Sequence, residues 1–402
     1  MSAYIVAAAR TAAGRNRGSL RNVHPVTLGG AVLNGLLDKC PSLDPALVDD
    51  VIFGCVSQAG EKAGNVARQC VLSSNLPESV PGTTVDRQCG SSQQAIHFAA
   101  QAVMSGTQDI VFAGGVESMT RVPMFSNMPK NLGKPNDDSI KAKYGTSAEF
   151  FSQFHGAEAM GVKFEIEREA MDIFAARSHA RAAAATAAGR FVSEIVPVLG
   201  HDKEENEVVF NEDEGIREGT TPEKLAGLET LVEMGVVSAV PGGPSAGAIT
   251  AGNASQISDG AAGLIICNDE GLKKLGSSVT PLARIHSLAL AANDPVLMLS
   301  APIPATQKVL ANAGLTIDDI DLYEVNEAFA VVPMAWSKMV GADEEKLNVN
   351  GGACALGHPL GATGAKLMTT LVNELVRREA RYGLLSICEG GGTANATIIE
   401  RC

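Results

Sequence analysis

The chain has 402 residues, 45% of them hydrophobic and 19% charged, with a formal net charge of −13. This length allows two or three domains with large cores, and the acidic charge argues against a general nucleic-acid-binding protein. It contains no stretch of the roughly 18 uncharged apolar residues that a membrane-spanning helix needs, so we expect no membrane span. Eight scattered cysteines without metal-site spacing predict reduced thiols, no metal site, and a cytoplasmic or other reducing, matrix-like compartment.

The first part of the chain alternates segments typical of strands and helices. Residues 3–9 form an apolar run, as in a buried strand, and residues 109–115 form another that ends in glycines. Alternation of this kind is typical of a parallel sheet with right-handed crossover connections. Between these two strands we predict a helix at 27–37, a strand at 48–56 and a helix at 65–73.

Cys89 lies where an extended segment turns into a helix that we predict over residues 92–104. The free N–H groups and the positive dipole end at the start of a helix favour a thiolate. Gly90 lets a bulky substrate approach the backbone closely. Taken alone, Cys89 is more simply explained as a small buried hydrophobic residue.

The strand and helix alternation stops near Pro123. We predict a surface loop at 123–145, helices within 147–190 and a solvated acidic loop at 202–214. We therefore expect an inserted cap domain at 123–246. It would separate an N-terminal half at 1–122, completed by 247–270, from a C-terminal half at 271–402.

The alternation resumes in the last third of the chain. We predict a strand at 282–291, a helix at 302–313, a strand at 321–325, a helix at 327–340, a helix within 351–374 and a strand at 383–388. Each half then holds a cysteine near a glycine-rich turn, which suggests two similar halves.

Three stretches of the second half carry residues suited to catalysis. Asn326 follows a predicted strand, where sites form in α/β folds. His358 lies in a glycine-rich stretch and can act as a base for a thiol nucleophile. Cys388 can shuttle protons, and the glycines from Gly390 to Gly392 expose N–H groups to a developing oxyanion. Each feature alone is most simply structural, but their occurrence together with Cys89 favours an enzyme.

The chain resembles the thiolases (acetyl-CoA acyltransferases) along essentially its whole length. The resemblance rests on specific stretches: Ala7–Thr11 with Gly14, the Cys89 segment, Ala113–Met119, Met160-Gly161, Thr250–Ser255, Asn326–Phe329, Gly357–Pro359 and Cys388–Gly392. It implies an α/β thiolase fold, in which two similar βαβ-rich halves form a layered α/β/α/β/α core with an inserted cap.

The resemblance also implies a role for each catalytic residue. Cys89 would be the acyl-accepting nucleophile, activated by His358. Cys388 would be the acid and base at the substrate α-carbon. Asn326 would hold a water that forms one oxyanion hole with His358, and the N–H groups of Cys89 and Gly390 would form the other.

The expected ligands follow from the same resemblance. Coenzyme A would be a co-substrate, with no tightly bound cofactor, and the partners would be acyl-CoA substrates. The predicted substrate and coenzyme A contacts are Arg217, Ser255, Met160 and Phe329. Family members are homo-oligomers, so we expect a homodimer or a homotetramer.

Some residues depart from the commoner family pattern. Asp86 stands where an asparagine usually precedes the nucleophile, Ser92-Gln-Gln94 replaces Gly-Leu-Gln, and Ala159 replaces a histidine of short-chain biosynthetic members. Together with a longer cap around 231–247, these differences favour a degradative thiolase of fatty-acid or steroid side-chain breakdown. The alternatives are a biosynthetic acetoacetyl-CoA thiolase, a decarboxylating ketoacyl synthase, a cysteine hydrolase and a catalytically silent, thiolase-like CoA-binding protein.

Overall fold

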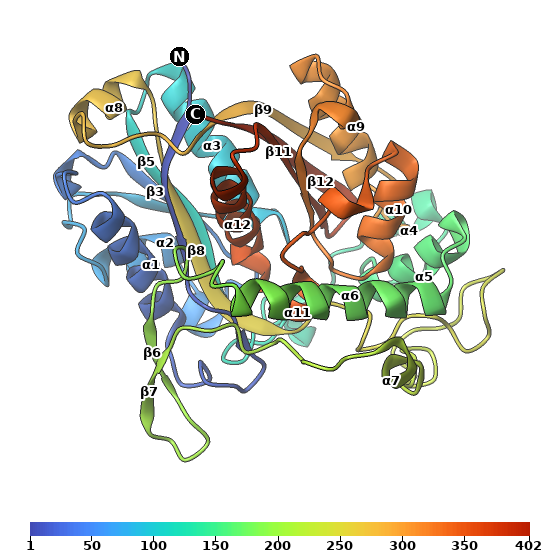
Figure 1. Ribbon diagram of the computed structural model, residues 1–402. Helices are drawn as coiled ribbons and strands as arrows, with labels where there is room; N and C mark the ends of the chain where they lie inside the picture. Colours follow the sequence, from blue (N-terminus) through green and yellow to red (C-terminus); the bar gives the residue numbers. More distant parts are fainter.

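The computed structural model describes residues 1–402 apart from the side chain of residue 130 (Figure 1). Ten strands form one hydrogen-bonded sheet in the order β10-β11-β12-β9-β1-β8-β5-β3-β4, with the short β2 paired to β8, and β6 and β7 form a separate hairpin. The strands are β1 (Tyr4–Arg10), β2 (Gly14–Arg15), β3 (Asp50–Gly54), β4 (Gly82–Val85), β5 (Ile110–Ser118), β6 (Val198–His201), β7 (Glu207–Phe210), β8 (Ser258–Cys267), β9 (Ala283–Ala292), β10 (Leu322–Val325), β11 (Tyr382–Glu389) and β12 (Thr393–Arg401).

The sheet is mixed, so the prediction of a parallel sheet was only partly right. Strand β3 runs parallel to β4 and β5, and β10 runs parallel to β11. Strand β8 is antiparallel to β1 and β5, and β12 is antiparallel to β9 and β11. The three residues between β11 and β12 are too few for a crossover connection, which forces these two strands to be antiparallel. Our sequence analysis did not predict β12.

The helices cover both outer faces and fill the centre. Every helix among the described residues is too short or too polar to cross a membrane. The α-helices are α1 (Pro25–Lys39), α2 (Val66–Leu72), α3 (Ser91–Ser105), α4 (Asp138–Tyr144), α5 (Gln153–Phe164), α6 (Arg168–Ala187), α7 (Pro222–Ala226), α8 (Asp269–Leu275), α9 (Pro302–Ala313), α10 (Val331–Val340), α11 (Ala353–Leu356) and α12 (Thr363–Arg378).

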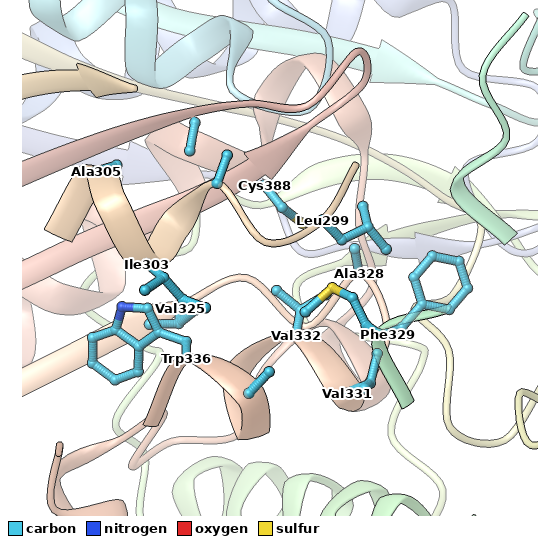
Figure 2. Packing of buried hydrophobic residues seen from close by; sticks show 14 of the residues in the cluster. Leu299, Ile303, Ala305, Val325, Ala328, Phe329, Val331, Val332, Trp336 and Cys388 are labelled. Carbon is cyan, nitrogen blue, oxygen red and sulfur yellow. The ribbon is translucent and has the colours of Figure 1, made fainter. Parts of the chain in front are cut away.

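The layered arrangement expected of the fold is confirmed. In the centre, α12 packs on α3 and touches strands of both halves, β1, β5 and β8 on one side and β10, β11 and β12 on the other. Figure 1 shows α12 in the middle, with α1 and α2 on one side and α9 and α10 on the other. Separate apolar clusters lie under each outer layer and around the central pair, and Figure 2 shows the one that contains Trp336 and Ile303. The two central helices therefore separate two sheet halves.

The segment predicted as a cap differs from expectation in two places. The predicted loop at 123–145 contains α4, and the predicted acidic loop at 202–214 contains β7, which forms a hairpin with β6. The helices predicted within 147–190 are α5 and α6, which are separated where Glu165 takes a left-handed conformation with φ of 54°. Short polar strands and helices carry little hydrophobic periodicity, which explains why the sequence pattern missed them. The boundaries of the three predicted domains remain a prediction.

Two glycines on neighbouring strands allow the loop after His358 to lie directly on the sheet. A Cβ atom on Gly54 would lie 2.5 Å from the carbonyl oxygen of Gly361, and a Cβ on Gly115 would overlap with the same oxygen. Real Cβ atoms do not approach backbone so closely, so both positions require glycine. The sheet is therefore shaped to receive this loop.

A buried ion pair fixes the same region. Glu117 at the end of β5 pairs with Lys62, and both side chains are fully buried. The Glu117 carboxylate also accepts hydrogen bonds from the N–H groups of Val56 at 2.9 Å, Ser57 at 3.3 Å and Gly361 at 2.9 Å. One carboxylate thus joins the end of β5, the loop after β3 and the loop after His358.

We predict that Lys62→Met lowers the free energy of unfolding by about 3–5 kcal/mol, because it leaves the Glu117 carboxylate buried without its cation. Urea denaturation measures the change. The control is Lys273→Met, which removes a lysine from an exposed pair with Glu270 and should leave the stability almost unchanged. Equal, small effects of the two substitutions would contradict the importance of the buried pair.

Candidate active site

Cys89 lies in a rigid turn directly before α3. The side-chain oxygen of Ser91 accepts a hydrogen bond from the N–H of Arg87 at 2.9 Å and donates one to the carbonyl of Gln88. Gln88 has a positive φ of 48°, a conformation that L-residues adopt rarely and that is concentrated at functional sites. Cys89 is only 8% exposed, so the residue is almost fully buried.

The electrostatic environment of Cys89 differs from our prediction. Burial raises the pKa of the Cys89 thiol to about 12, and the nearby carboxylate of Glu389 acts in the same direction. The prediction that the start of α3 favours a thiolate in the resting protein was therefore wrong, because desolvation outweighs the helix dipole. The thiol needs a base that removes its proton as it attacks.

His358 is present as a neutral base. Burial, followed by the charge of Lys366, lowers the pKa of the His358 ring to about 3. Nδ1 lies 2.6 Å from the Oγ1 of Thr363, and this hydroxyl donates its own proton to the carbonyl of Pro359 at 3.0 Å. The hydroxyl must then accept from Nδ1, which assigns the ring proton to Nδ1 and the free lone pair to Nε2.

Asn326 lies against this lone pair. Its Nδ2 atom is 3.3 Å from the Nε2 atom of His358, which brings two of the predicted catalytic residues together. The Oδ1 atom of Asn326 is buried and has no hydrogen-bond partner among the described residues. A buried polar atom of this kind is costly unless a ligand or an ordered water satisfies it. Asn326 and His358 thus form a polar corner of the site.

Cys388 ends β11 inside an apolar environment. Burial, followed by the charges of Cys89 and Glu389, raises the pKa of the Cys388 thiol well above its ordinary value. Figure 2 shows Cys388 near Leu299 and Ala328, which explains its burial. The expected proton transfer by Cys388 therefore starts from the protonated thiol in the resting protein. Cys388 is a thiol there and holds a proton that it can donate.

The two cysteine-bearing segments meet at Gly390. A Cβ atom on Gly390 would lie 2.9 Å from the Oε1 atom of Gln88, so the turn after Cys388 lies against the residue before Cys89. Gly391 and Gly392 continue this turn with φ values of 81° and 80°, which favour glycine. This contact places the backbone of Gly390 beside the nucleophile segment.

An apolar cavity of about 440 Å³ opens above Cys89. The core contributes Gly390, Gly391 and Leu360 to its wall. The segment predicted as the cap contributes six aromatic or sulphur-containing side chains, namely Met124, Phe125, Met128, Phe150, Phe151 and Phe154, together with smaller and polar residues. A cavity of this size and character suits an apolar ligand group of considerable bulk.

Backbone hydrogen bonds join three of the motifs that carried the resemblance. The N–H of Ser255 donates to Ala328 at 2.9 Å, and the N–H of Ala330 donates to Asn253 at 2.8 Å. The N–H of His358 donates to Gln256 at 3.1 Å. The segment before β8 thereby fixes both the Asn326 loop and the His358 loop.

The four predicted contacts to substrate and coenzyme A lie in different environments. Arg217 is exposed, and its backbone N–H donates to the Nδ1 atom of His179 at 3.1 Å. Ser255 is half-buried beside the Asn326 loop. Met160 and Phe329 are buried in the same apolar cluster, where Phe329 packs edge-on against a cavity residue, Phe154, at 6.1 Å between ring centroids. Arg217 and Ser255 are accessible to a ligand, whereas Met160 is packed in the core.

A second cavity, of about 790 Å³, lies between α5, α6 and α7. Its wall includes many carboxylates: Glu158, Glu165, Glu167, Glu169, Asp172 and Glu223. A wall of this charge repels an anionic ligand. The smaller cavity, which holds Cys89, is therefore the candidate active site.

Two residues that shape the site, Thr363 and Glu389, were not among the site residues predicted from the sequence. Thr363 follows His358 by five residues in the glycine-rich stretch, and its role depends on the chain folding back at the start of α12. Glu389 follows Cys388 directly, and only the structure shows its carboxylate facing Cys89. Adjacency in sequence was the one available signal, and it does not show where a side chain points.

Comparisons with known proteins agree with this geometry. The profile of the thiolase N-terminal domain matches residues 3–270, and that of the thiolase C-terminal domain matches residues 279–401. The chain is 50% identical to the steroid 3-ketoacyl-CoA thiolase FadA6 of Mycobacterium tuberculosis, over 99% of this chain and 94% of that protein. It is 42% identical to a 3-ketoacyl-CoA thiolase of Salmonella typhimurium, over 99% and 98%. The crystal structure of the Bacillus anthracis acetyl-CoA acetyltransferase matches with a TM-score of 0.87 at 37% identity, covering 100% of this chain and 99% of that one. The chain belongs to the thiolase family of acyltransferases.

Proposed function

We propose that this enzyme catalyses the CoA-dependent thiolytic cleavage of 3-oxoacyl-CoA to acetyl-CoA and a shortened acyl-CoA, or the reverse condensation, through an acyl-Cys89 intermediate. The observation that carries this proposal is a pair of buried thiols, Cys89 and Cys388, that act on each other electrostatically, with Cys89 in the wall of an apolar cavity. The neutral His358, held between Thr363 and Asn326, supplies the base. A covalent acyl intermediate divides a difficult C–C cleavage into two easier steps.

In the first step, the Sγ atom of Cys89 attacks the 3-oxo carbonyl carbon while its proton passes to the Nε2 atom of His358. The C–C bond then breaks, and its electron pair forms the enolate of acetyl-CoA. The thiol of Cys388 donates its proton to the enolate α-carbon and becomes a thiolate. In the second step, the thiol of coenzyme A attacks the acyl-Cys89 carbonyl, Cys89 is released, and the protons return to the two cysteines.

The oxyanions of these steps form at two places, which calls for two sets of hydrogen-bond donors. We assign one to the polar corner of Asn326 and His358, where the unpartnered Oδ1 atom of Asn326 suits an ordered water. We assign the other to the backbone N–H groups of Cys89 and Gly390. The contact between the Gln88 side chain and Gly390 supports this pairing.

The acyl group that we propose is larger than acetyl. An apolar cavity of about 440 Å³ next to the nucleophile would leave much empty space around an acetoacetyl group. The names of the similar mycobacterial and Salmonella proteins agree with a degradative role on larger 3-oxoacyl groups. Arg217 and Ser255, both accessible, would contact coenzyme A.

We further propose that the enzyme is a homodimer or a homotetramer in a reducing compartment such as the cytoplasm. Strand β4 forms one edge of the large sheet, and an edge strand is a ready template for pairing with another chain. The eight cysteines are free thiols, as expected in a reducing environment. Light scattering after size-exclusion chromatography measures the oligomeric state.

The test of the proposed function is intact-mass spectrometry after mixing the protein with acetoacetyl-CoA and with longer 3-oxoacyl-CoA thioesters. We predict an acyl adduct on Cys89 that disappears when free coenzyme A is added, and we predict that Cys89→Ala forms no adduct and has no activity. Removing one sulphur opens only a small cavity, so circular dichroism should show an unchanged fold. An active Cys89→Ala enzyme would refute the mechanism, and a wild-type protein without any adduct would favour a silent CoA-binding protein.

We predict that Thr363→Val lowers kcat/KM about tenfold to a hundredfold, because the His358 ring loses the hydroxyl that holds its proton on Nδ1. The loss should lie mainly in kcat, since the threonine does not line the cavity. Thr363→Ser keeps the hydroxyl and should restore most of the activity. If serine and valine variants are equally impaired, the threonine has only a packing role.

We predict that Met128→Trp lowers kcat/KM for long or bulky 3-oxoacyl-CoA at least about tenfold more than for acetoacetyl-CoA. The larger side chain fills the cavity that Met128 lines, whereas a short acyl group stays close to Cys89. Met234→Trp is the matched control, because Met234 is an exposed residue outside this cavity. Parallel losses for short and long substrates would show that the cavity does not hold the acyl chain.

A further inference from the structure

The carboxylate of Glu389 is buried beside the two segments that carry the cysteines, and the mechanism above gives it no role. Its side chain is fully buried at the end of β11. The Oε2 atom accepts a hydrogen bond from the hydroxyl of Thr393 at 2.7 Å. The Oε1 atom has no hydrogen-bond partner among the described residues. A buried carboxylate with only one of its two oxygens hydrogen-bonded lowers the stability of the fold, so its presence indicates a functional role.

The side chain of Glu389 reaches from one cysteine-bearing segment to the other. Glu389 follows Cys388, yet its Oε1 atom occupies the space in which a Cβ atom on Gly90 would lie. Gly90 in turn follows Cys89 and begins α3. The carboxylate is thus lodged beside both thiols, and the absence of a side chain at Gly90 makes room for it.

Several charged and titratable groups face this carboxylate and the two thiols. Arg87, from the turn before α3, is the cation that acts on Glu389, and its Nε atom is also buried without a partner among the described residues. On α3, the ring of His97 is neutral, because burial and then the charge of Arg87 lower its pKa. On the side of Cys89, the carboxylates of Asp86 and Glu117 add weaker contributions than Glu389 does.

Glu389 responds to pH in the range in which enzymes work. Burial raises the pKa of its carboxyl to about 7, against the opposing effects of the Thr393 hydrogen bond and the charge of Arg87. Above this pH the carboxyl is ionised, and its negative charge raises the pKa of both Cys89 and Cys388. Below it the carboxyl is neutral and this effect disappears.

We propose that Glu389 is a positioning residue for the thiolase reaction: its carboxylate, lodged against Gly90, adds like-charge repulsion to the effect of burial, so that Cys89 and Cys388 hold their protons more tightly in the unliganded enzyme. The roles of the two cysteines in this statement rest on the proposed function. A thiolate beside an ionised carboxylate experiences like-charge repulsion in a dry site, so each sulphur holds its proton more tightly. The resting enzyme then carries the Cys388 proton that C–C cleavage consumes.

The test is the pH dependence of thiol alkylation by iodoacetamide, because only the thiolate reacts. Peptide mapping measures the rate at Cys89, which lines the cavity, between about pH 6 and pH 10. In Glu389→Gln, which removes the charge and keeps the shape, the rise of this rate should move to lower pH by about one unit. Glu205→Gln is the control for net charge, since Glu205 is an exposed residue paired with Arg21, and it should leave the profile unchanged.

Profiles of Glu389→Gln that superimpose on those of the wild type would overturn the proposal. Glu389→Met, an uncharged side chain of similar length, provides a second variant if Glu389→Gln does not fold, and its thiol profile should shift in the same direction. An unshifted profile in a folded Glu389→Met protein would equally overturn the proposal.

The outcome is separable from that of the proposed function. Alkylation requires no substrate, so a shifted profile supports the role of Glu389 whether or not a thioester acylates the protein. If the wild type forms no acyl adduct although the profile shifts, the thiolase mechanism fails and the electrostatic role remains. If the adduct forms and the profile does not shift, the mechanism stands and the role of Glu389 is refuted.

Discussion

Exclusion of water is the constraint on which the active site depends. Burial is the largest influence on Cys89, Cys388 and His358, and in each case it favours the neutral form. A site built from two thiols and an unprotonated imidazole holds its protons where the reaction needs them and carries no charge that must be solvated. The dry site also protects an acyl-cysteine from hydrolysis, which distinguishes an acyltransferase from a cysteine hydrolase.

A dry site of this kind has to be held by the backbone, because its own side chains form few bonds to one another. The loop after His358 packs on glycines of β3 and β5, and its backbone donates a hydrogen bond to Glu117. The segment before β8 forms backbone hydrogen bonds with the Asn326 and His358 loops. Elements far apart in the sequence thereby set the position of each reacting atom, and the buried ion pair of Glu117 with Lys62 holds the carboxylate that binds the His358 loop.

The sequence predicted the elements with strong hydrophobic patterns and the residues of distinctive motifs. The strands around Cys89, helices α1, α3 and α9, and the meeting of Asn326 with His358 agree with the structure. It did not predict α4 or the hairpin of β6 and β7, which are short and polar. It also missed β12, although the glycines before this strand signal a turn. It also misjudged the protonation of Cys89, since the balance between a helix dipole and desolvation depends on the depth of burial. No motif encodes that depth.

The same reasoning limits what the catalytic residues reveal about the substrate. In the proposed mechanism, Cys89, His358, Asn326 and Cys388 act on a thioester and its α-carbon, which are common to short and long substrates. The proposed determinant of acyl-group size is instead the cavity wall, which comes largely from residues 124–154 of the predicted cap. These residues lie in a segment with little periodicity, and only folding brings their aromatic rings over Cys89. The proposed specificity of this protein therefore depends on the part of the chain whose structure its sequence pattern indicates least.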